Sequence, residues 1–534
     1  MTRPQTTVLE ALAQRLAEDP DGPYLDFEGD AYTAREMDLA SNRFARALAA
    51  LDVTHGDRVA TLLENRAEQV ISFFGALKLG AVQVPINTAY KGEFLRHQLA
   101  DSGAVVFVVQ GDFASRGAEV IGRETTPVLR HCITVDAADA VIDAVPTTTW
   151  EHALEQASDA AIEGVTVRPS DLACFIYTAG TTGPSKGCTL PHNYIVSLAD
   201  QIIRTWRRRP DDIVLTPLPL FHFNAISVCV VGTLLVGGSA AIERRFSVSR
   251  FWPEVQRTRA TMVSMLGSLA ILIANAEDVP ESRGHNLRLC AAAPMPPDTD
   301  RIWRERFGCE TFTGGYGLTE ASLISMLDAG EENKPGAAGK PNQHEFEVIL
   351  VDDDDNEVPL GEVGEIVCRP RGPNLMFSGY WNRADATVEA TRNLWFHTGD
   401  LGRLDEDGYL FFVDRKKDAL RRRGENISSF EMEKVVYAHP AVRDAAVHAV
   451  PSAVSEDDVK VTVVLIDDAQ VTEEELCRWV AERVPYFAIP RYVEFRDDLP
   501  RNPVGRVLKY QLRDDGVTEH TWDREAAGVE FDRR

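Results

Sequence analysis

The sequence predicts an α/β protein with a large N-terminal domain of parallel-type sheets flanked by helices, a β-rich subdomain, and a small C-terminal α+β domain. Three observations support this prediction. The 534 residues exceed what one hydrophobic core can organise. Apolar runs typical of buried strands alternate with helical segments through most of the chain. From residue 346 onward, short strands separated by Asp, Gly and Asn turns replace that alternation.

The large domain is assigned to residues 1–413 from the order of its elements. Helical periodicity over 35–50 and 66–79 leads into a strand at 80–85, and further strands are expected at 105–109, 172–176, 213–216, 262–265 and 309–312. Helices between successive strands favour parallel pairing, because a parallel connection needs a crossover. The β-rich subdomain covers about 346–413, with strands expected at 346–351 and 364–368.

The small domain is assigned to residues 419–534, after a charged boundary segment at 414–418 (DRKKD). Its pattern predicts a helix at 429–438, strands at 445–450 and 460–465, and a helix at 472–483. About 115 residues suffice for a compact α+β unit. The last twenty residues are expected to pack poorly.

Bulk composition excludes several classes of protein. A net charge of −26 argues against nucleic acid and against an anionic membrane surface as partners, so a polyphosphate site must be locally basic or rich in amide N–H groups. The eight cysteines are scattered without a C-x-x-C pair, and no run of eighteen apolar residues occurs. We therefore expect a soluble, cytoplasmic protein without structural zinc or a disulfide framework.

The segment 177–187 (YTAGTTGPSKG) has the chemistry of a polyphosphate-binding loop. Its glycines let the backbone approach an anion, its hydroxyls and amides donate hydrogen bonds, and Lys186 adds a positive charge. It is not a Walker A loop, because Gly180 and Gly183 are too close together and Gly187 follows the lysine. A plain surface turn is the alternative explanation.

Six further segments carry candidate residues, and each has a plainer explanation when taken alone. The segment 314–320 (GGYGLTE) resembles a Gly-rich turn before a helix, and 395–400 (WFHTGD) a strand that ends in a turn. The segment 414–418 resembles a solvated charge run, and His222 within 218–224 (LPLFHFN) a core histidine. The segments 291–294 (AAAP) and 424–427 (GENI) are weak signals by themselves.

Together, in this order and spacing, these segments resemble the adenylate-forming enzymes, which include acyl-CoA synthetases, peptide-synthetase adenylation domains and beetle luciferases. The loop at 177–187 matches nearly residue for residue, except that Ala179 stands where that family usually has a hydroxyl. The N-terminal region and the segment 521–528 (TWDREAAG) further resemble the bacterial branch of carnitine/crotonobetaine-CoA ligases. The resemblance implies a mobile C-terminal lid that rotates about Lys417, with 424–427 as the loop that swings in for a second half-reaction.

The resemblance also implies a nucleotide site. Tyr316 would lie against adenine, Thr319 on the α-phosphate, Asp400 on the ribose with Arg415 nearby, and Glu320 on Mg²⁺. These types suit their tasks, because a flat ring fits a purine and a hard carboxylate fits a hard cation. The remaining residues implied for ATP binding are Thr178, Gly180, Thr181, Thr182, Gly183, Lys186, Ala292, Ala293, Pro294, Gly315, Gly317 and Lys417.

The implied activity is ATP-dependent activation of a small or aromatic carboxylic acid as acyl-AMP, with release of pyrophosphate, followed by thioester formation with CoA. His222 would orient the reacting carboxylate. The expected substrate pocket consists of His222, Phe223, Asn224, Ser264, Gly267 and Gly315. A homodimer is left open.

One motif departs from the family pattern. The family's last basic loop is P-x-x-x-x-G-K, whereas this chain has 499–509 (LPRNPVGRVLK), with Arg506 at the lysine position and Lys509 three residues later. Arginine and lysine are not equivalent at a point-charge site. Either Arg506 performs the lysine's task, or Lys509 reaches in, or the enzyme activates another oxyanion. The last alternative is a ligase or diazotase that activates nitrite for attack by an aryl amine, and a nucleotide-binding homologue without turnover also stays open.

Overall fold

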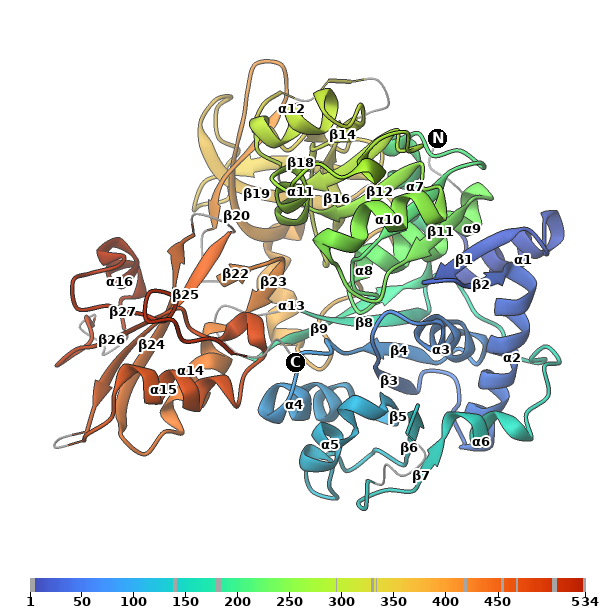
Figure 1. Cartoon of the computed structure of the whole chain (residues 1–534), viewed down its shortest axis with the longest axis horizontal. Coiled ribbons are helices and arrows are strands. Elements are labelled where there is room, and N and C mark those ends of the chain that lie inside the picture. The colour runs from blue at the N-terminus through green and yellow to red at the C-terminus, as the bar shows by residue number, and fades with distance from the viewer. Residues whose placement is uncertain are drawn as a thin grey trace.

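Two large sheets build the N-terminal part of the chain in the computed structural model (Figure 1). The structure describes residues 5–137, 142–178, 184–293, 295–327, 331–332, 334–415, 420–452, 456–466, 469–501 and 507–531. Within these ranges the first sheet has the strand order β7-β6-β5-β3-β4-β8-β9 and the second β14-β13-β12-β10-β11-β1-β2. All pairings are parallel except β8–β9 and β1–β2 at one edge of each sheet. The expected parallel-type sheets are confirmed.

The strands expected at 80–85, 105–109, 172–176, 213–216, 262–265 and 309–312 all lie in these two sheets, close to those positions. The first sheet consists of β3 (Arg58–Leu62), β4 (Val82–Pro85), β5 (Ala104–Gln110), β6 (His131–Val135), β7 (Thr147–Thr149), β8 (Leu172–Thr178) and β9 (Lys186–Pro191). The second consists of β1 (Pro23–Phe27), β2 (Asp30–Thr33), β10 (Ile213–Thr216), β11 (Ser239–Ile242), β12 (Met262–Leu266), β13 (Leu289–Ala293) and β14 (Glu310–Phe312). The carboxyl ends of parallel strands meet at one edge, which is where open α/β sheets bind ligands.

Helices cover the faces of these sheets, and α1, α2 and α6 begin at a threonine side-chain cap. Thr7 and Thr33 form capping boxes with Glu10 and Glu36 at the starts of two helices. The helices of this part are α1 (Val8–Glu18), α2 (Ala34–Ala50), α3 (Ala67–Lys78), α4 (Gly92–Ser102), α5 (Gly111–Val120), α6 (Trp150–Glu155), α7 (His192–Trp206), α8 (Phe223–Ala225), α9 (Gly232–Val236), α10 (Val248–Thr258), α11 (Gly267–Ala274) and α12 (Pro297–Glu305).

Antiparallel sheets follow, as the change of sequence pattern predicts. The first contains β15 (Gly315–Leu318), β16 (Ser322–Met326) and β17 (Lys340–Pro341). The next contains β18 (Phe346–Val351), β19 (Val363–Pro370), β20 (Phe396–Leu404) and β21 (Leu410–Arg415), with α13 (Ala384–Ala390) between β19 and β20.

The plainer explanations of two motifs are wrong in detail. The segment 314–320 is not a turn before a helix, because β15 pairs with β16 as a hairpin. A Cβ on Gly317 would lie 2.0 Å from the Ser322 carbonyl oxygen, so the close approach of the two strands requires glycine there. Strand β20 does not end at Asp400 but continues to Leu404, which allows Asp400 to pair with Arg415 on β21.

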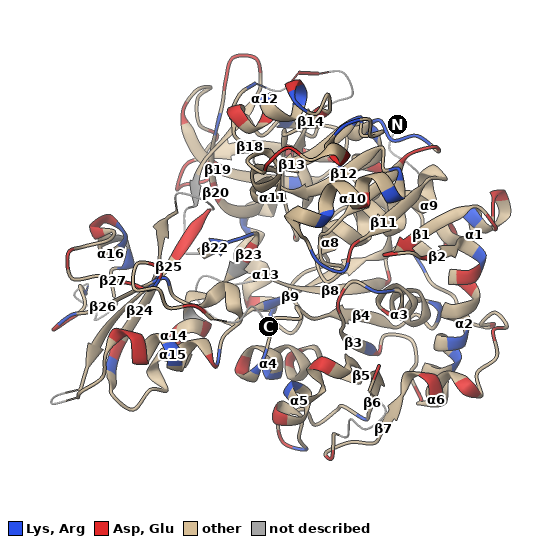
Figure 2. Ribbon diagram, viewed as in Figure 1, with Lys and Arg blue, Asp and Glu red and all other residues tan. Residues whose placement is uncertain are grey.

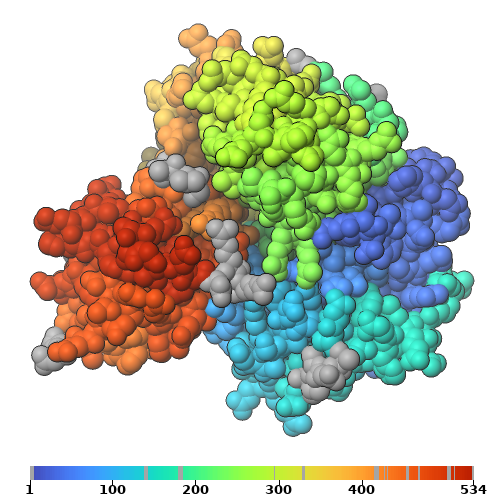
Figure 3. Space-filling view, viewed as in Figure 1, coloured from blue at the N-terminus to red at the C-terminus, as the bar shows by residue number. Residues whose placement is uncertain are grey.

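The C-terminal part forms a separate lobe, orange to red in Figure 3. It contains β22 (Leu420–Arg422), β23 (Glu425–Ile427), α14 (Ser429–Tyr437), β24 (Val442–Pro451), β25 (Asp457–Leu465), α15 (Glu473–Ala481), β26 (Tyr492–Phe495), α16 (Lys509–Asp515) and β27 (Trp522–Asp523). The strands β24-β25-β26-β27 form one sheet in this order. The predicted α+β character of this lobe is confirmed.

The expectation that the last twenty residues pack poorly is correct only in part: positions such as Glu519 and His520 are exposed, but others pack on the sheet. Trp522 on β27 pairs with β26 and packs against the core of the small domain. The buried Lys460 ammonium donates to Glu494 at 2.5 Å, to the Gly516 carbonyl at 2.6 Å and to Thr521 at 3.0 Å. These contacts tie the end of the chain to the sheet.

Glu494 is the centre of this polar cluster. Burial alone would raise the pKa of Glu494, but hydrogen bonds from Lys460, Thr521, Arg496 and Thr518 outweigh it and lower that pKa to about 2. Burial lowers the pKa of Lys460 in spite of the same pair. The pair therefore stabilises the fold by less than the carboxylate's shift alone implies.

The small domain packs against α4 and the flank of the phosphate-loop hairpin. Lys91, just before α4, donates to the Ala481 carbonyl of α15 at 2.9 Å, and Phe94 belongs to the small domain's apolar core. The Ser185 amide donates to Glu431 of α14 at 3.0 Å. The two domains therefore touch beside the loop that the sequence assigns to phosphate.

Charge and cysteine placement follow the composition. Acidic and basic segments are interspersed along both lobes in Figure 2. All eight cysteines are buried and unpaired. Among the described residues, no helix is long and apolar enough to cross a membrane, and no group of three or more His, Cys, Asp or Glu residues is arranged to hold a metal ion.

Candidate functional site

A continuous cleft of about 2570 Å³ brings most of the candidate residues together. Both domains line it, and the two large sheets end at its wall. The candidate residues that line it are Thr178, Lys186, His222, Phe223, Asn224, Ser264, Ala292, Ala293, Gly315, Tyr316, Gly317, Thr319, Glu320 and Asp400. Segments more than 200 residues apart in the sequence thus converge on one site.

The end of the cleft where phosphate is expected is built on the β8–β9 hairpin. Thr178 pairs with Lys186 in the register of the hairpin, at the two ends of the Gly-rich loop. The Lys186 ammonium lies 4.4 Å from the centre of the Tyr380 ring. A cation held by a neutral ring keeps its charge available to a phosphate, whereas an ion pair would offset it.

Glu320 lies beside this hairpin with 7% of its surface exposed. Its Oε1 accepts hydrogen bonds from the Thr178 hydroxyl at 3.3 Å and from the Tyr380 hydroxyl at 2.9 Å. Tyr194 fixes the backbone around it, because its hydroxyl donates to the Thr319 carbonyl at 2.8 Å and accepts from the Ser322 amide at 2.9 Å. The carboxylate is therefore held in one orientation at the cleft wall.

The donor set at Glu320 fits Mg²⁺ better than an ion that needs many protein ligands. Mg²⁺ is usually held by one or two carboxylates together with substrate phosphates and water. Glu320 supplies one carboxylate at the β8–β9 hairpin, in the part of the cleft that Thr178 and Lys186 also line. The arrangement suits a Mg²⁺ ion that arrives with a nucleotide.

At the end of the cleft where the purine and ribose are expected, Tyr316 on β15 contacts Asp400 on β20. The Tyr316 hydroxyl donates to Asp400 Oδ2 at 2.6 Å, and its ring lies 6.2 Å from the Phe412 ring. Burial, followed by the Asp400 carboxylate, raises the pKa of Tyr316, so the phenol stays neutral and continues to donate. Ala292 and Ala293 end β13 beside this pair and leave room for a flat base.

The end of the cleft where the substrate acid is expected, called the acyl end below, is lined by aromatic and aliphatic side chains. The Phe223 and Tyr194 rings are stacked with centroids 5.1 Å apart, and the Trp206 and Phe312 centroids are 6.1 Å apart. Ser264 on β12 and Asn224 on α8 add polar groups. Gly267 is buried at the start of α11 and does not line the cleft, although its neighbours Leu266 and Ser268 do.

His222 at the acyl end contacts the small domain. Its Nε2 lies 3.0 Å from both oxygens of Glu425 on β23, and the Asn87 side-chain amide donates to Glu425 Oε2 at 3.1 Å. Burial would lower the pKa of His222, but the Glu425 carboxylate outweighs it and the net shift is upward. The segment 424–427 therefore lies on the acyl site in this domain arrangement.

Lys509 lies away from the cleft. Its ammonium pairs with Glu433 at 2.7 Å and donates a hydrogen bond to the Ser429 hydroxyl oxygen at 2.9 Å, and both partners lie on α14. Eight of the expected site positions cannot be placed relative to the cleft: Gly180, Thr181, Thr182, Gly183, Pro294, Lys417 and Arg506, and the side chain of Arg415, lie outside the described residues.

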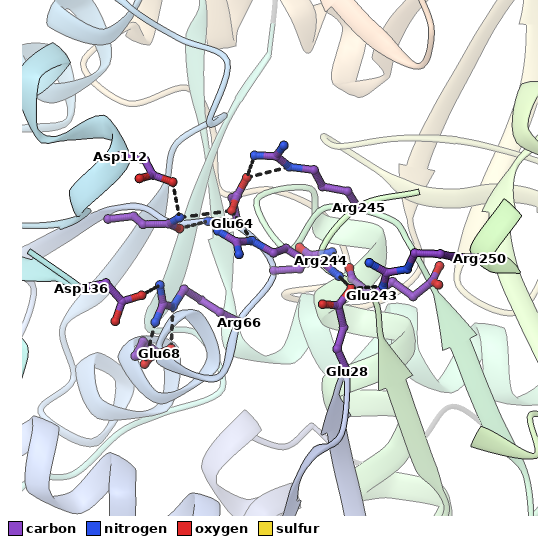
Figure 4. Close-up of polar contacts among 12 residues, drawn as sticks. Glu28, Glu64, Arg66, Glu68, Asp112, Asp136, Glu243, Arg244, Arg245 and Arg250 are labelled. Carbon is purple, nitrogen blue, oxygen red and sulfur yellow. Dashed lines mark hydrogen bonds and ion pairs between the residues drawn. The ribbon is translucent and has the colours of Figure 1, made fainter. Parts of the chain in front are cut away.

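The sequence motifs did not predict a cluster of arginines at the rim of the cleft (Figure 4). Glu64 is 6% exposed and accepts from Arg244 Nε at 2.5 Å and from Arg245 Nε at 2.8 Å. These two guanidinium side chains remain about half exposed and line the cleft with Arg250. The signal was an Arg-Arg pair in a chain of net charge −26, directly after an apolar run.

Asn65, next to Glu64, was also missed. Its Nδ2 donates to the carbonyls of Leu218 and Glu243, each at 2.9 Å, and its Oδ1 accepts from the Leu220 amide at 2.7 Å. It thereby fixes the loop that carries His222. A buried asparagine that satisfies only backbone groups leaves no periodic pattern in a sequence.

Comparison with known proteins gives a consistent result. The family model described as AMP-binding enzyme matches residues 12–381, and the one described as AMP-binding enzyme C-terminal domain matches residues 431–506. A long-chain-fatty-acid–CoA ligase of Escherichia coli O6:H1 is 32% identical over 95% of this chain and 94% of its own length. A crotonobetaine/carnitine–CoA ligase of Salmonella arizonae is 29% identical over 92% of this chain and 96% of its own. The solved o-succinylbenzoate CoA synthetase from Bacillus subtilis, a double mutant bound with a product analogue, is 28% identical with a TM-score of 0.80, covering 94% of this chain and 98% of that one.

Proposed function

This chain belongs to the AMP-binding enzyme family and is an AMP-forming ligase of the acyl-CoA synthetase type, and we propose that it activates a small or aromatic carboxylic acid with ATP and transfers the acyl group to CoA. One observation carries the proposal. A single cleft joins Lys186, Glu320 and the Tyr316–Asp400 pair to the aromatic pocket around His222. A nucleotide and an acid bound there would meet at the α-phosphate.

The residues of the cleft would contribute mainly by positioning and electrostatics, as in other nucleotidyl transfers. Lys186 and the hydroxyl of Thr178 would hold the phosphates. Asp400 would accept from the ribose hydroxyls in place of the Tyr316 phenol. A Mg²⁺ ion at Glu320 would supply positive charge to the phosphates when bound. The carboxylate oxygen would attack the α-phosphorus, giving acyl-AMP and pyrophosphate.

The second half-reaction is supported by the domain arrangement. The small domain's 424–427 segment contacts the acyl site, where a thiol would have to arrive. The arginines at the rim match a thiol carrier that bears phosphates, because guanidinium groups bind phosphate in a bidentate manner. The apolar lining favours acids with an aromatic or short aliphatic body.

A pyrophosphate-release screen tests the proposal. Carboxylic acids, then aryl amines with nitrite, are offered with ATP and Mg²⁺, and CoA is added in parallel. The proposal expects pyrophosphate with one or more acids and AMP plus a thioester once CoA is present. Release only with nitrite and an aryl amine would replace it with the diazotase alternative, and ATP binding without release would indicate a homologue without turnover.

A further inference from the structure

A carboxylate of the small domain completes a dyad with a histidine of the large domain. Glu425 lies on β23 with 14% of its side chain exposed, and its two oxygens are equidistant from His222 Nε2. Asn87 holds the second oxygen from the opposite side. His222 and Glu425 are 203 positions apart, so the dyad exists only while the domains are docked in this arrangement.

The carboxylate beside Nε2 favours one tautomer of the imidazole. An ionised carboxylate only accepts hydrogen bonds, so Nε2 carries the proton that faces Glu425. In the neutral ring, Nδ1 is then the atom that can take a proton. The His222 side chain is 40% exposed and lines the cleft at its acyl end, so it can meet an incoming group.

We propose that His222 and Glu425 form a general base that is assembled between the domains and deprotonates the attacking thiol, an inference that rests on the proposed function. The thiol proton passes to His222 Nδ1 as the sulfur lone pair attacks the acyl carbon of the adenylate. The bond between that carbon and the AMP oxygen breaks, and AMP leaves as an anion. The imidazolium then releases its proton to water, so the products are thioester, AMP and one proton.

The surrounding charges favour this role. Glu425 stabilises the imidazolium of His222 as it forms, and the positive charge of Arg421 destabilises it. Tyr90, which is buried and neutral, also lies near the Glu425 carboxylate. A higher pKa of the imidazole brings it closer to the ordinary pKa of a thiol, about 8.5. A smaller difference between the two pKa values improves proton transfer from the thiol to the imidazole. When the domains separate, His222 loses Glu425 and becomes a weaker base. In that state water is the only nucleophile available to the adenylate, so its attack receives less help from a general base.

The test measures the two half-reactions separately in the full chain. Pyrophosphate release without CoA reports the first, and single-turnover thioester formation from enzyme-bound acyl-AMP reports the second. Glu425→Gln is compared with Asn87→Ala, which loosens the contact without removing charge, and with Glu519→Gln, the same charge change at a side chain that is 88% exposed.

The expected result is a fall of about 100-fold in the second half-reaction for Glu425→Gln, the lower range for general-base catalysis. The acidic limb of its pH–rate profile should move to lower pH, because His222 loses the charge that raises its pKa. Asn87→Ala should lower the rate without moving the profile, and Glu519→Gln should match wild type. Added imidazole should restore part of the second half-reaction in His222→Ala.

Two outcomes overturn the inference while the proposed function survives. One is a loss of rate in the second half-reaction of Glu425→Gln that is the same at every pH, so that the pH profile does not shift. The dyad would then be only a structural contact between the domains. The other is no rescue of His222→Ala by imidazole together with a wild-type second half-reaction in Glu425→Gln. Failure of the proposed function differs from both, because no acid would then release pyrophosphate even from wild type.

Discussion

Replacing Gly424 with alanine should slow the second half-reaction about 5- to 30-fold. Gly424 has φ +81, and a Cβ there would lie 2.4 Å from Leu266 Cδ1 across the domain interface. Overpacking of this kind costs about 1–3 kcal/mol, and the free end of a leucine can yield, so we take about 1–2 kcal/mol. At about 1.4 kcal/mol per tenfold change, this gives the stated loss. The left-handed backbone at this position adds about 1 kcal/mol of strain for a residue with a Cβ. That strain destabilises the small domain equally whether or not it is docked on the large domain.

The assay compares single-turnover thioester formation with pyrophosphate release. Gly408→Ala is the matched control, because Gly408 has φ +79 with open space around its Cβ position and so carries the strain without the clash. Leu266→Ala in the Gly424→Ala background should recover most of the loss. Equal losses in both half-reactions, or no recovery in the double variant, would refute the claim that this contact belongs to the second half-reaction alone.

Three further predictions follow from the site and the small domain. Glu320→Ala should abolish pyrophosphate release, and Asp400→Ala should weaken ATP binding, measured by calorimetry, by about 1.5–3 kcal/mol, the range for a hydrogen bond to a charged group; wild-type turnover in both would contradict the nucleotide site. Glu494→Gln should lower the unfolding free energy at pH 7 by at most about 3 kcal/mol. Because the folded pKa of Glu494 is depressed, the deficit should shrink as pH falls from about 4.5 to about 2, and a deficit that does not depend on pH would exclude the carboxylate as its source. Lys509→Ala should affect adenylation less than Arg506→Ala, since the Lys509 ammonium is held on α14; the reverse order in a pyrophosphate-release assay would assign the basic role to Lys509.

Local patterns were sufficient to predict much of the fold. The strands at 105–109 and 262–265 and the helices at 35–50 and 66–79 appear within two residues of their expected bounds, because each is set by short-range periodicity. The segment 314–320 was ambiguous for the same reason. Its glycines suit a turn, but close strand approach at Gly317 also requires glycine, and only the partner strand decides between them.

Long-range polar contacts could not be predicted from the sequence. The last twenty residues are rich in charge, and that composition hides the pairs, such as Arg491 with Asp523 at 3.2 Å, that hold them to the sheet. The Glu425–His222 contact depends on how the two domains dock, which no periodicity encodes. The motifs led to candidate residues that share one cleft, whereas the small domain's contact with His222 required the structure.

Single-turnover analysis with ATP labelled at the α-phosphate tests the central claim most directly. Without CoA, an accepted acid should give labelled acyl-AMP bound to the protein and one equivalent of pyrophosphate. Addition of CoA should convert that label to AMP as a thioester appears. Formation of ADP and phosphate, or of AMP without an acyl-AMP that CoA can consume, would contradict an adenylate-forming ligase with two half-reactions in one cleft.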